Sequence, residues 1–205
     1  IELRKAELKG IEIIDDNKRY YPYGSFASHI IGFTDIDNNG LYGIEKTFDK
    51  YLNGTPGKWI KTTDAKGMQL PYGSEKLYEA TNGLNAVLTL DETIQHFAEK
   101  AAMEALVKNK AKNVSIIVME PKTGDILAMA TKPDFDPNNP REPLDENTKE
   151  QWKNLSQEEL EKEWYNMWRN FAINDSYEPG STFKIITSAI GLEENIVNPD
   201  SHFYC

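Results

Sequence analysis

A serine and a lysine three positions apart, Ser181 and Lys184, could together supply a nucleophile and its base. A serine hydroxyl becomes a useful nucleophile when a base accepts its proton. Because positions i and i+3 share one face of a helix, the Lys184 amine could reach the Ser181 hydroxyl. A lysine amine acts as a base only in its neutral form, which burial or nearby positive charge favours. The spacing predicts nucleophilic catalysis, and the alternative is a serine N-cap followed by a solvated lysine.

The elements around this pair would place it at the start of a helix. Pro179-Gly180 predicts a tight turn, and residues 181–195 follow with apolar side chains on nearly every face. Such a helix is expected to lie buried at the centre of a domain. Ser181 would then sit in the first turn, where unpaired backbone N–H groups and the helix dipole favour a developing negative charge.

Composition excludes several classes of protein. A net charge of −10 argues against nucleic-acid binding, which needs a basic surface. No apolar run approaches the roughly 18 residues of a membrane-spanning helix, and no signal peptide is visible. The chain starts without Met, and we expect it to be a fragment. A single cysteine excludes a disulfide framework within these residues.

Residues 81–205 carry the clearest secondary-structure signals. Asp91 predicts a helix N-cap, and the apolar stripe that follows predicts a helix to about residue 106. Residues 114–119 and 125–130 predict two strands, with a hairpin turn at Lys122-Thr123-Gly124. Weaker patterns predict a strand over 84–90, an irregular loop over 132–150 and an exposed helix over 151–168. In residues 1–80, helical spacing over 44–52 and a strand over 59–63 predict a mixed α+β module.

The last residues predict a possible metal site. Asp200, His202 and Cys205 bring a carboxylate, an imidazole and a thiol together within six residues. These are the donor types of zinc, which usually takes four. We expect a fourth ligand from elsewhere. The alternatives are an ordinary surface loop, or a disulfide from Cys205 to a later cysteine.

Several sequence blocks resemble the class B penicillin-binding proteins, and particularly their sporulation and division types. The nucleophile region of that family resembles Glu178-Pro179-Gly180-Ser181-Thr182-Phe183-Lys184, preceded by Trp168-Arg169-Asn170. Further matching blocks, in the family's order, lie at residues 19–24, 27–32, 40–45, 52–57, 88–95, 121–130 and 133–138. Blocks in register with the Ser181–Lys184 pair make this a specific resemblance.

The resemblance implies an α+β fold in two parts. Residues 1–80 would form a non-catalytic pedestal of dimerisation type, and residues 81–205 the first part of a transpeptidase domain with an antiparallel, five-stranded sheet flanked by helices. It implies a peptidoglycan D,D-transpeptidase in which Ser181 attacks D-Ala-D-Ala stem peptides or β-lactams and Lys184 is the base. It further implies that catalysis requires no cofactor, so a zinc ion would be structural or regulatory.

The resemblance also implies a cellular setting. The protein would lie at the outer face of the cell membrane, anchored by a transmembrane helix outside this stretch, with a glycosyltransferase as its partner and no bound nucleic acid.

The sequence departs from the family's pattern in two ways. An S-x-N motif is absent from these residues, and the literal Lys122-Thr123-Gly124 precedes Ser181, so it is interpreted as a structural turn. The later active-site motifs are expected beyond Cys205. Two alternatives remain: a serine β-lactamase or β-lactam sensor, and a non-catalytic scaffold.

Overall fold

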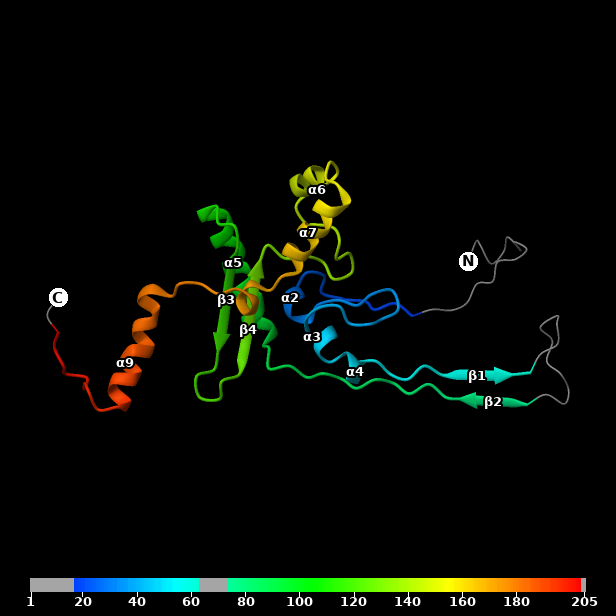
Figure 1. The fold of residues 1–205 in the computed structure, drawn as a ribbon, viewed down its shortest axis with the longest axis horizontal. Coiled ribbons are helices and arrows are strands. Elements are labelled where there is room, and N and C mark those ends of the chain that lie inside the picture. The colour runs from blue at the N-terminus through cyan, green and yellow to red at the C-terminus, as the bar shows by residue number, and fades with distance from the viewer. Residues whose placement is uncertain (1–16, 63–73, 204–205) are drawn as a thin grey trace. The chain divides into compact units, whose positions relative to one another are not determined.

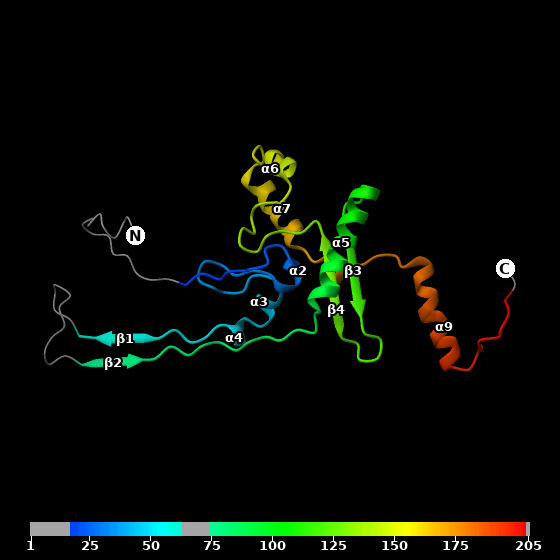
Figure 2. The same ribbon diagram turned by 180° about the vertical axis from the view of Figure 1, so that it is seen from behind.

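The computed structural model describes residues 17–62 and 74–203, and the chain divides into two compact units. The first unit comprises residues 1–173, and the second comprises residues 174–205. The fold is α+β, as the sequence predicts, and Figures 1 and 2 show its helices and strands.

The first unit begins with short helices and a two-stranded ribbon. Helices α2 (Ser28–Ile31), α3 (Gly43–Thr47) and α4 (Asp49–Leu52) precede strands β1 (Lys58–Lys61) and β2 (Glu75–Tyr78). The predicted helix over 44–52 is therefore two short helices that meet at Phe48. The strands pair antiparallel, with Trp59 opposite Leu77.

Helix α5 (Glu92–Asn109) packs on a hairpin of strands β3 (Val114–Met119) and β4 (Ile126–Lys132). The predicted N-cap is confirmed, because the Asp91 carboxylate accepts the Ile94 backbone N–H at 2.9 Å. Small side chains let the helix approach the strand closely: Ala98 and Ala102 of α5 are buried with Ala128 and Ala130 of β4. The predicted pair of strands is also confirmed, with Ile116 opposite Ala130.

The predicted strand over 84–90 is wrong. Val87 is 93% exposed and Leu84 is 67% exposed, so the segment lacks the buried face that its alternation suggested. Its backbone makes single hydrogen bonds to neighbours, such as Leu84 N–H to the Tyr51 carbonyl at 2.7 Å, and forms no ladder with a described strand. Isolated bonds of this kind do not hold a strand in register.

Two helices, α6 (Glu146–Trp152) and α7 (Gln157–Trp168), follow an irregular segment after β4. The predicted loop over 132–150 thus ends five residues early, because Asp145 caps α6 by accepting the Thr148 backbone N–H at 2.8 Å. Helix α7 begins with a capping box in which Ser156 and Glu159 bond reciprocally. Helix α8 (Phe171–Asn174) comes next along the chain.

An aromatic cluster joins distant parts of the first unit. Tyr21 and Phe33 are buried against Phe135 and Trp168, and the Phe33 and Trp168 ring centroids lie 5.0 Å apart. Residues from both predicted domains therefore share one core. The predicted boundary at residue 80 stays a prediction.

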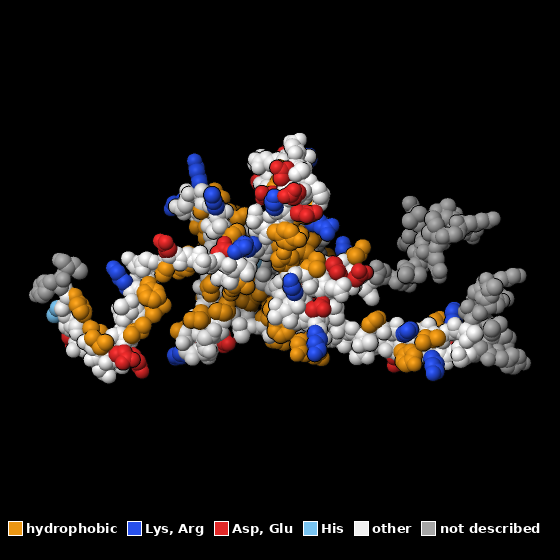
Figure 3. Space-filling model, in the orientation of Figure 1, with side chains coloured by type: hydrophobic (Ala, Val, Ile, Leu, Met, Phe, Trp, Pro, Cys, Tyr) orange, Lys and Arg blue, Asp and Glu red, His pale blue; other side chains and the backbone are white. Residues whose placement is uncertain are grey.

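The second unit contains a 3₁₀ turn, η1 (Gly180–Phe183), followed directly by helix α9 (Lys184–Glu193). The expected burial of this helix is not observed within the described residues. Ile185 is 74% exposed, and no residue of α9 is buried. Figure 3 shows apolar side chains at the surface along α9. The second unit has no described strand for this apolar surface to pack against.

Candidate active site

Ser181 and Lys184 lie at the start of the predicted helix. Gly180 opens it with φ +53°, a left-handed conformation that favours glycine. The Thr182 backbone N–H then donates to the Pro179 carbonyl at 3.1 Å, which closes the first turn. Ser181 falls in the 3₁₀ turn and Lys184 is the first residue of α9. The 3₁₀ turn begins at Gly180, one residue before the predicted helix start, and the α-helix itself begins three residues after that predicted start.

The two side chains are separated by one helical turn. The Lys184 backbone N–H donates to the Ser181 carbonyl, which fixes their relative position along the helix. Both side chains are exposed. Neither has a side-chain hydrogen bond or ion pair within the part of the chain that the structure describes. The arrangement therefore supplies a hydroxyl and an amine on one helix start, where the first backbone N–H groups lack intrahelical partners.

Asn170 is a buried residue that sequence reasoning named only as part of a matching block. Its Oδ1 accepts the Ala172 backbone N–H at 3.1 Å and the Thr131 hydroxyl at 3.5 Å. Its Nδ2 lies 3.5 Å from the Met129 sulfur. Asn170 thus links the last residues of the first unit to strand β4. The chain continues from there toward Ser181.

The Lys122-Thr123-Gly124 sequence forms the turn between β3 and β4, as expected. The Gly124 backbone N–H donates to the Glu120 carbonyl at 2.8 Å, and Gly124 has φ +83°. The Thr123 hydroxyl donates to the Asp125 carboxylate at 2.8 Å, within the turn itself. These contacts confirm that the tripeptide is a structural turn.

An ion pair lies within residues 1–80, the segment predicted to be the pedestal. The buried Glu45 carboxylate accepts two bonds from the Arg19 guanidinium, at 2.7 and 3.2 Å. The Tyr21 hydroxyl donates to the same carboxylate at 3.4 Å. Burial, and then the Glu45 charge, raise the pKa of Tyr21 to about 12. The family resemblance of the blocks at 19–24 and 40–45 could have suggested that they lie close to each other in the fold. Nothing in their spacing along the chain predicts this ion pair.

The predicted metal ligands are only partly visible. Asp200 and His202 are exposed, and the Asp200 backbone N–H donates to Asn198 Oδ1 at 3.0 Å within a local turn. Cys205 lies outside the described residues. Within residues 17–62 and 74–203, no cluster of three or more His, Cys, Asp or Glu side chains could hold a metal ion. The three-residue zinc site therefore stays a prediction. Across the same described stretches, no helix has the length and apolar content to cross a membrane.

Two family models match the chain. The penicillin-binding protein dimerisation domain matches residues 1–88, and the penicillin-binding protein transpeptidase domain matches residues 114–205. Together they take in both described units, including η1 and α9.

Curated relatives agree with these models. The chain is 38% identical over 197 residues to stage V sporulation protein D of Bacillus subtilis, covering 96% of this chain and 28% of that protein. It is 34% identical over 203 residues to peptidoglycan D,D-transpeptidase FtsI of Escherichia coli K12, covering 97% of this chain and 30% of the relative. The chain thus spans less than a third of the length of these relatives.

A solved structure shares the fold. Penicillin-binding protein 3 of Mycobacterium tuberculosis, complexed with aztreonam, is similar with a TM-score of 0.65 and 29% identity. The similarity covers 92% of this chain and 34% of that one. A complex of the same protein with ampicillin matches with a TM-score of 0.64.

Proposed function

This chain belongs to the class B penicillin-binding proteins, and from that membership we propose that it forms part of a serine D,D-transpeptidase that cross-links peptidoglycan. The observation that carries the proposal is the position of Ser181 and Lys184, one turn apart at a helix start that a glycine with positive φ introduces. A hydroxyl and an amine in this arrangement suit a nucleophile and its base.

In the proposed reaction, the Ser181 hydroxyl attacks the carbonyl carbon between the two D-alanines of a stem peptide. An ester bond forms, the peptide C–N bond breaks, and the serine proton passes through Lys184 to the departing D-alanine amine. The amine of a neighbouring stem peptide then attacks the ester, loses a proton and releases Ser181. A β-lactam would acylate the same hydroxyl as its amide bond opens.

The backbone supplies the remaining part of the proposed site. Carbonyl attack creates an oxyanion, which backbone N–H donors stabilise when they are already in place. The Ser181 backbone N–H at the helix start would be one such donor. The second donor and the group that binds the substrate carboxylate are proposed to come from the later active-site motifs, beyond residue 205.

The proposed setting follows from the same membership. We place the complete protein at the extracytoplasmic face of the cell membrane, held by a transmembrane helix, with a glycosyltransferase of the cell-wall machinery as its partner. The dimerisation-domain match over residues 1–88 supports this setting over that of a free serine β-lactamase.

A deacylation measurement separates these alternatives. The full-length protein should be acylated by a chromogenic cephalosporin in one burst and then hold the adduct for many minutes, because the natural acceptor is an amine rather than water. Rapid, repeated turnover would favour a β-lactamase instead. Failure of the protein to be acylated at all, with Ser181 intact, would favour a non-catalytic scaffold.

A further inference from the structure

A buried polar junction joins the loop before α2 to helix α5. The Glu99 carboxylate on α5 accepts the Ala27 backbone N–H at 2.8 Å and Gln95 Nε2 at 2.8 Å through the same oxygen, Oε1. Ala27 is the N-cap of α2 and has a left-handed φ of 50°, which is uncommon for a residue other than glycine. The loop before α2 is thus held by a carboxylate that lies 72 residues later in the chain.

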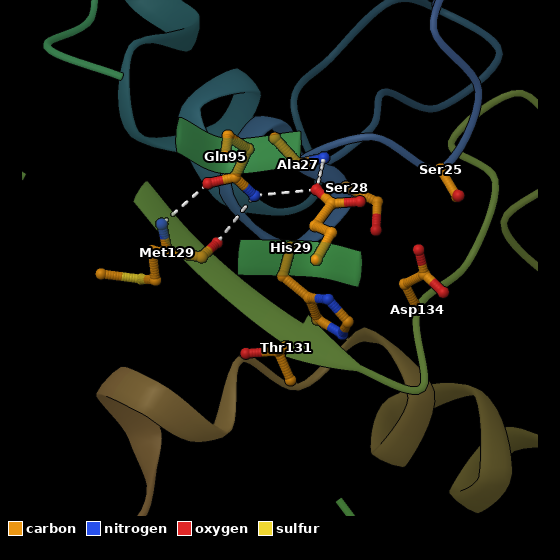
Figure 4. A pocket seen from close by; sticks show the side chains of 9 residues that line it. Ser25, Ala27, Ser28, His29, Gln95, Met129, Thr131 and Asp134 are labelled. Carbon is orange, nitrogen blue, oxygen red and sulfur yellow. Dashed lines mark hydrogen bonds between the residues drawn. The ribbon is translucent and has the colours of Figure 1, made fainter. Parts of the chain in front are cut away.

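Strand β4 enters the same junction through Gln95. This side chain is fully buried, and its Oε1 accepts the Met129 backbone N–H at 2.8 Å while its Nε2 donates to the Met129 carbonyl at 3.2 Å. Figure 4 shows Gln95 between Met129 and Ala27, with these bonds as dashed lines. Every polar atom of the Gln95 amide therefore has a protein partner.

The junction contains more negative than positive side chains. Lys132 Nζ lies 3.3 Å from Glu99 Oε2 and also binds Asp134 Oδ2. All three side chains are largely buried, with exposed fractions of 8%, 14% and 5% for Lys132, Glu99 and Asp134. One ammonium group thus faces two carboxylates. Because carboxylates only accept hydrogen bonds, Glu99 and Asp134 both depend on donors from neighbouring groups.

The Ser28 hydroxyl is a buried group of this junction that lacks a hydrogen-bond partner. It is 2% exposed, and its Oγ has no hydrogen-bond partner among the residues that the structure describes. The hydroxyl lines a small cavity of about 10 Å³, counted as the space open to the centre of a water molecule. Ser25, His29, Glu99, Thr131 and Asp134 line the same cavity. Figure 4 shows Ser25, Ser28 and Asp134 around this space.

We propose that this cavity is a binding site for one ordered water molecule, which bonds the Ser28 hydroxyl and a carboxylate oxygen of the junction. A cavity of roughly this size holds a single water when two to four polar partners surround it. The water would pair with the Ser28 hydroxyl, donate to one of these carboxylates and complete the contact between the loop and α5. A hard divalent cation fits less well, because it needs about six oxygen ligands and Lys132 already supplies the positive charge.

A crystal structure of the full-length protein, at a resolution that shows ordered water, tests the proposal. We expect one density peak at water hydrogen-bond distance from Ser28 Oγ and from Glu99 or Asp134. An empty cavity, a direct bond from Ser28 to a carboxylate, or an ion with short metal–oxygen distances would each overturn the proposal.

A pair of variants provides the control. Ser28→Val removes the hydroxyl and fills the cavity, so the peak should disappear. Ser188→Val makes the same change at an exposed position of α9, which does not line the cavity, and the peak should stay. A peak that persists in Ser28→Val would contradict the proposal. If Ser28→Val does not fold, the wild-type density still decides.

Discussion

His29 is a buried imidazole whose protonation the fold opposes. Its Nε2 lies 3.0 Å from the Met167 carbonyl, and its ring packs edge-on against Phe135. Burial lowers the pKa of His29, although the Met167 carbonyl, Asp134 and Glu99 act in the opposite direction and Lys132 acts with burial. The neutral ring is therefore the form that the folded state keeps.

This lowered pKa predicts a loss of stability in mild acid. The unfolded state takes up a proton near pH 6.5, where the native state does not, so stability is complete above that pH and falls as the pH drops toward the folded pKa. The loss is about 1.4 kcal/mol for each unit of pKa difference. Urea unfolding at pH 7.5 and 5.5 measures it.

A matched histidine provides the control for this prediction. His29→Gln keeps a donor for the Met167 carbonyl but cannot titrate, so the pH dependence should shrink. His96→Gln changes an exposed histidine of α5 and should leave it unchanged. Equal pH dependence in both variants would show that His29 is not the group responsible.

Lys184 is proposed to accept the Ser181 proton, and its removal should slow acylation. Lys184→Ala is expected to reduce the β-lactam acylation rate of the full-length protein by at least ~10²-fold, the low end for loss of a general base. Lys122→Ala, in the exposed turn between β3 and β4, should leave the rate near wild type. An unchanged rate in Lys184→Ala would place the base elsewhere.

At the scale of elements, Gly180 sets the start of the helix that carries Ser181. A Cβ at Gly180 or at Gly124 would meet no atom within 4 Å, so alanine at either site adds backbone strain without a clash. Each substitution should cost about 1 kcal/mol of stability. Only Gly180→Ala should also slow β-lactam acylation, because Gly124 lies in the turn between β3 and β4. Equal acylation rates in the two variants would remove the proposed role of this turn in positioning Ser181.

The segment after α9 carries the zinc prediction. If Asp200, His202 and Cys205 bind one zinc ion, the full-length protein purified without chelator should contain about one equivalent of it. Stripping the metal should lower the melting temperature, because a ligand that binds only the native state stabilises it. Less than about a tenth of an equivalent, with no thermal response to added zinc, would leave these residues as an ordinary loop.

Local patterns predicted elements well, and long-range contacts poorly. Helix α5, its Asp91 cap and the β3–β4 turn follow from periodicity and capping chemistry, which act between near neighbours. The strand over 84–90 failed because alternation alone does not supply a partner strand. The ion pair of Arg19 with Glu45 joins residues 26 apart, and the junction of Ala27 with Glu99 joins residues 72 apart. No short-range signal encodes such pairs.

At the scale of the whole molecule, the dimerisation segment and the start of the transpeptidase segment are packed together rather than linked loosely. The aromatic cluster of Phe33, Phe135 and Trp168 and the Glu99 junction both connect them. Residues of η1 and α9 carry the proposed chemistry in the second unit. The Ser181–Lys184 pair was identified from sequence because its spacing is local, whereas the rest of the active site is proposed to come from later motifs.

The central claim is that Ser181 is acylated, and mapping a β-lactam adduct tests it most directly. The full-length protein is labelled with a fluorescent penicillin and digested with trypsin, and the peptide of residues 170–184 is fragmented by mass spectrometry. This peptide also contains Ser176, so fragment ions must assign the adduct. We predict an adduct on Ser181 that is absent from Ser181→Ala and retained in Ser188→Ala. Labelling that survives Ser181→Ala, or that maps to another residue, would contradict the account.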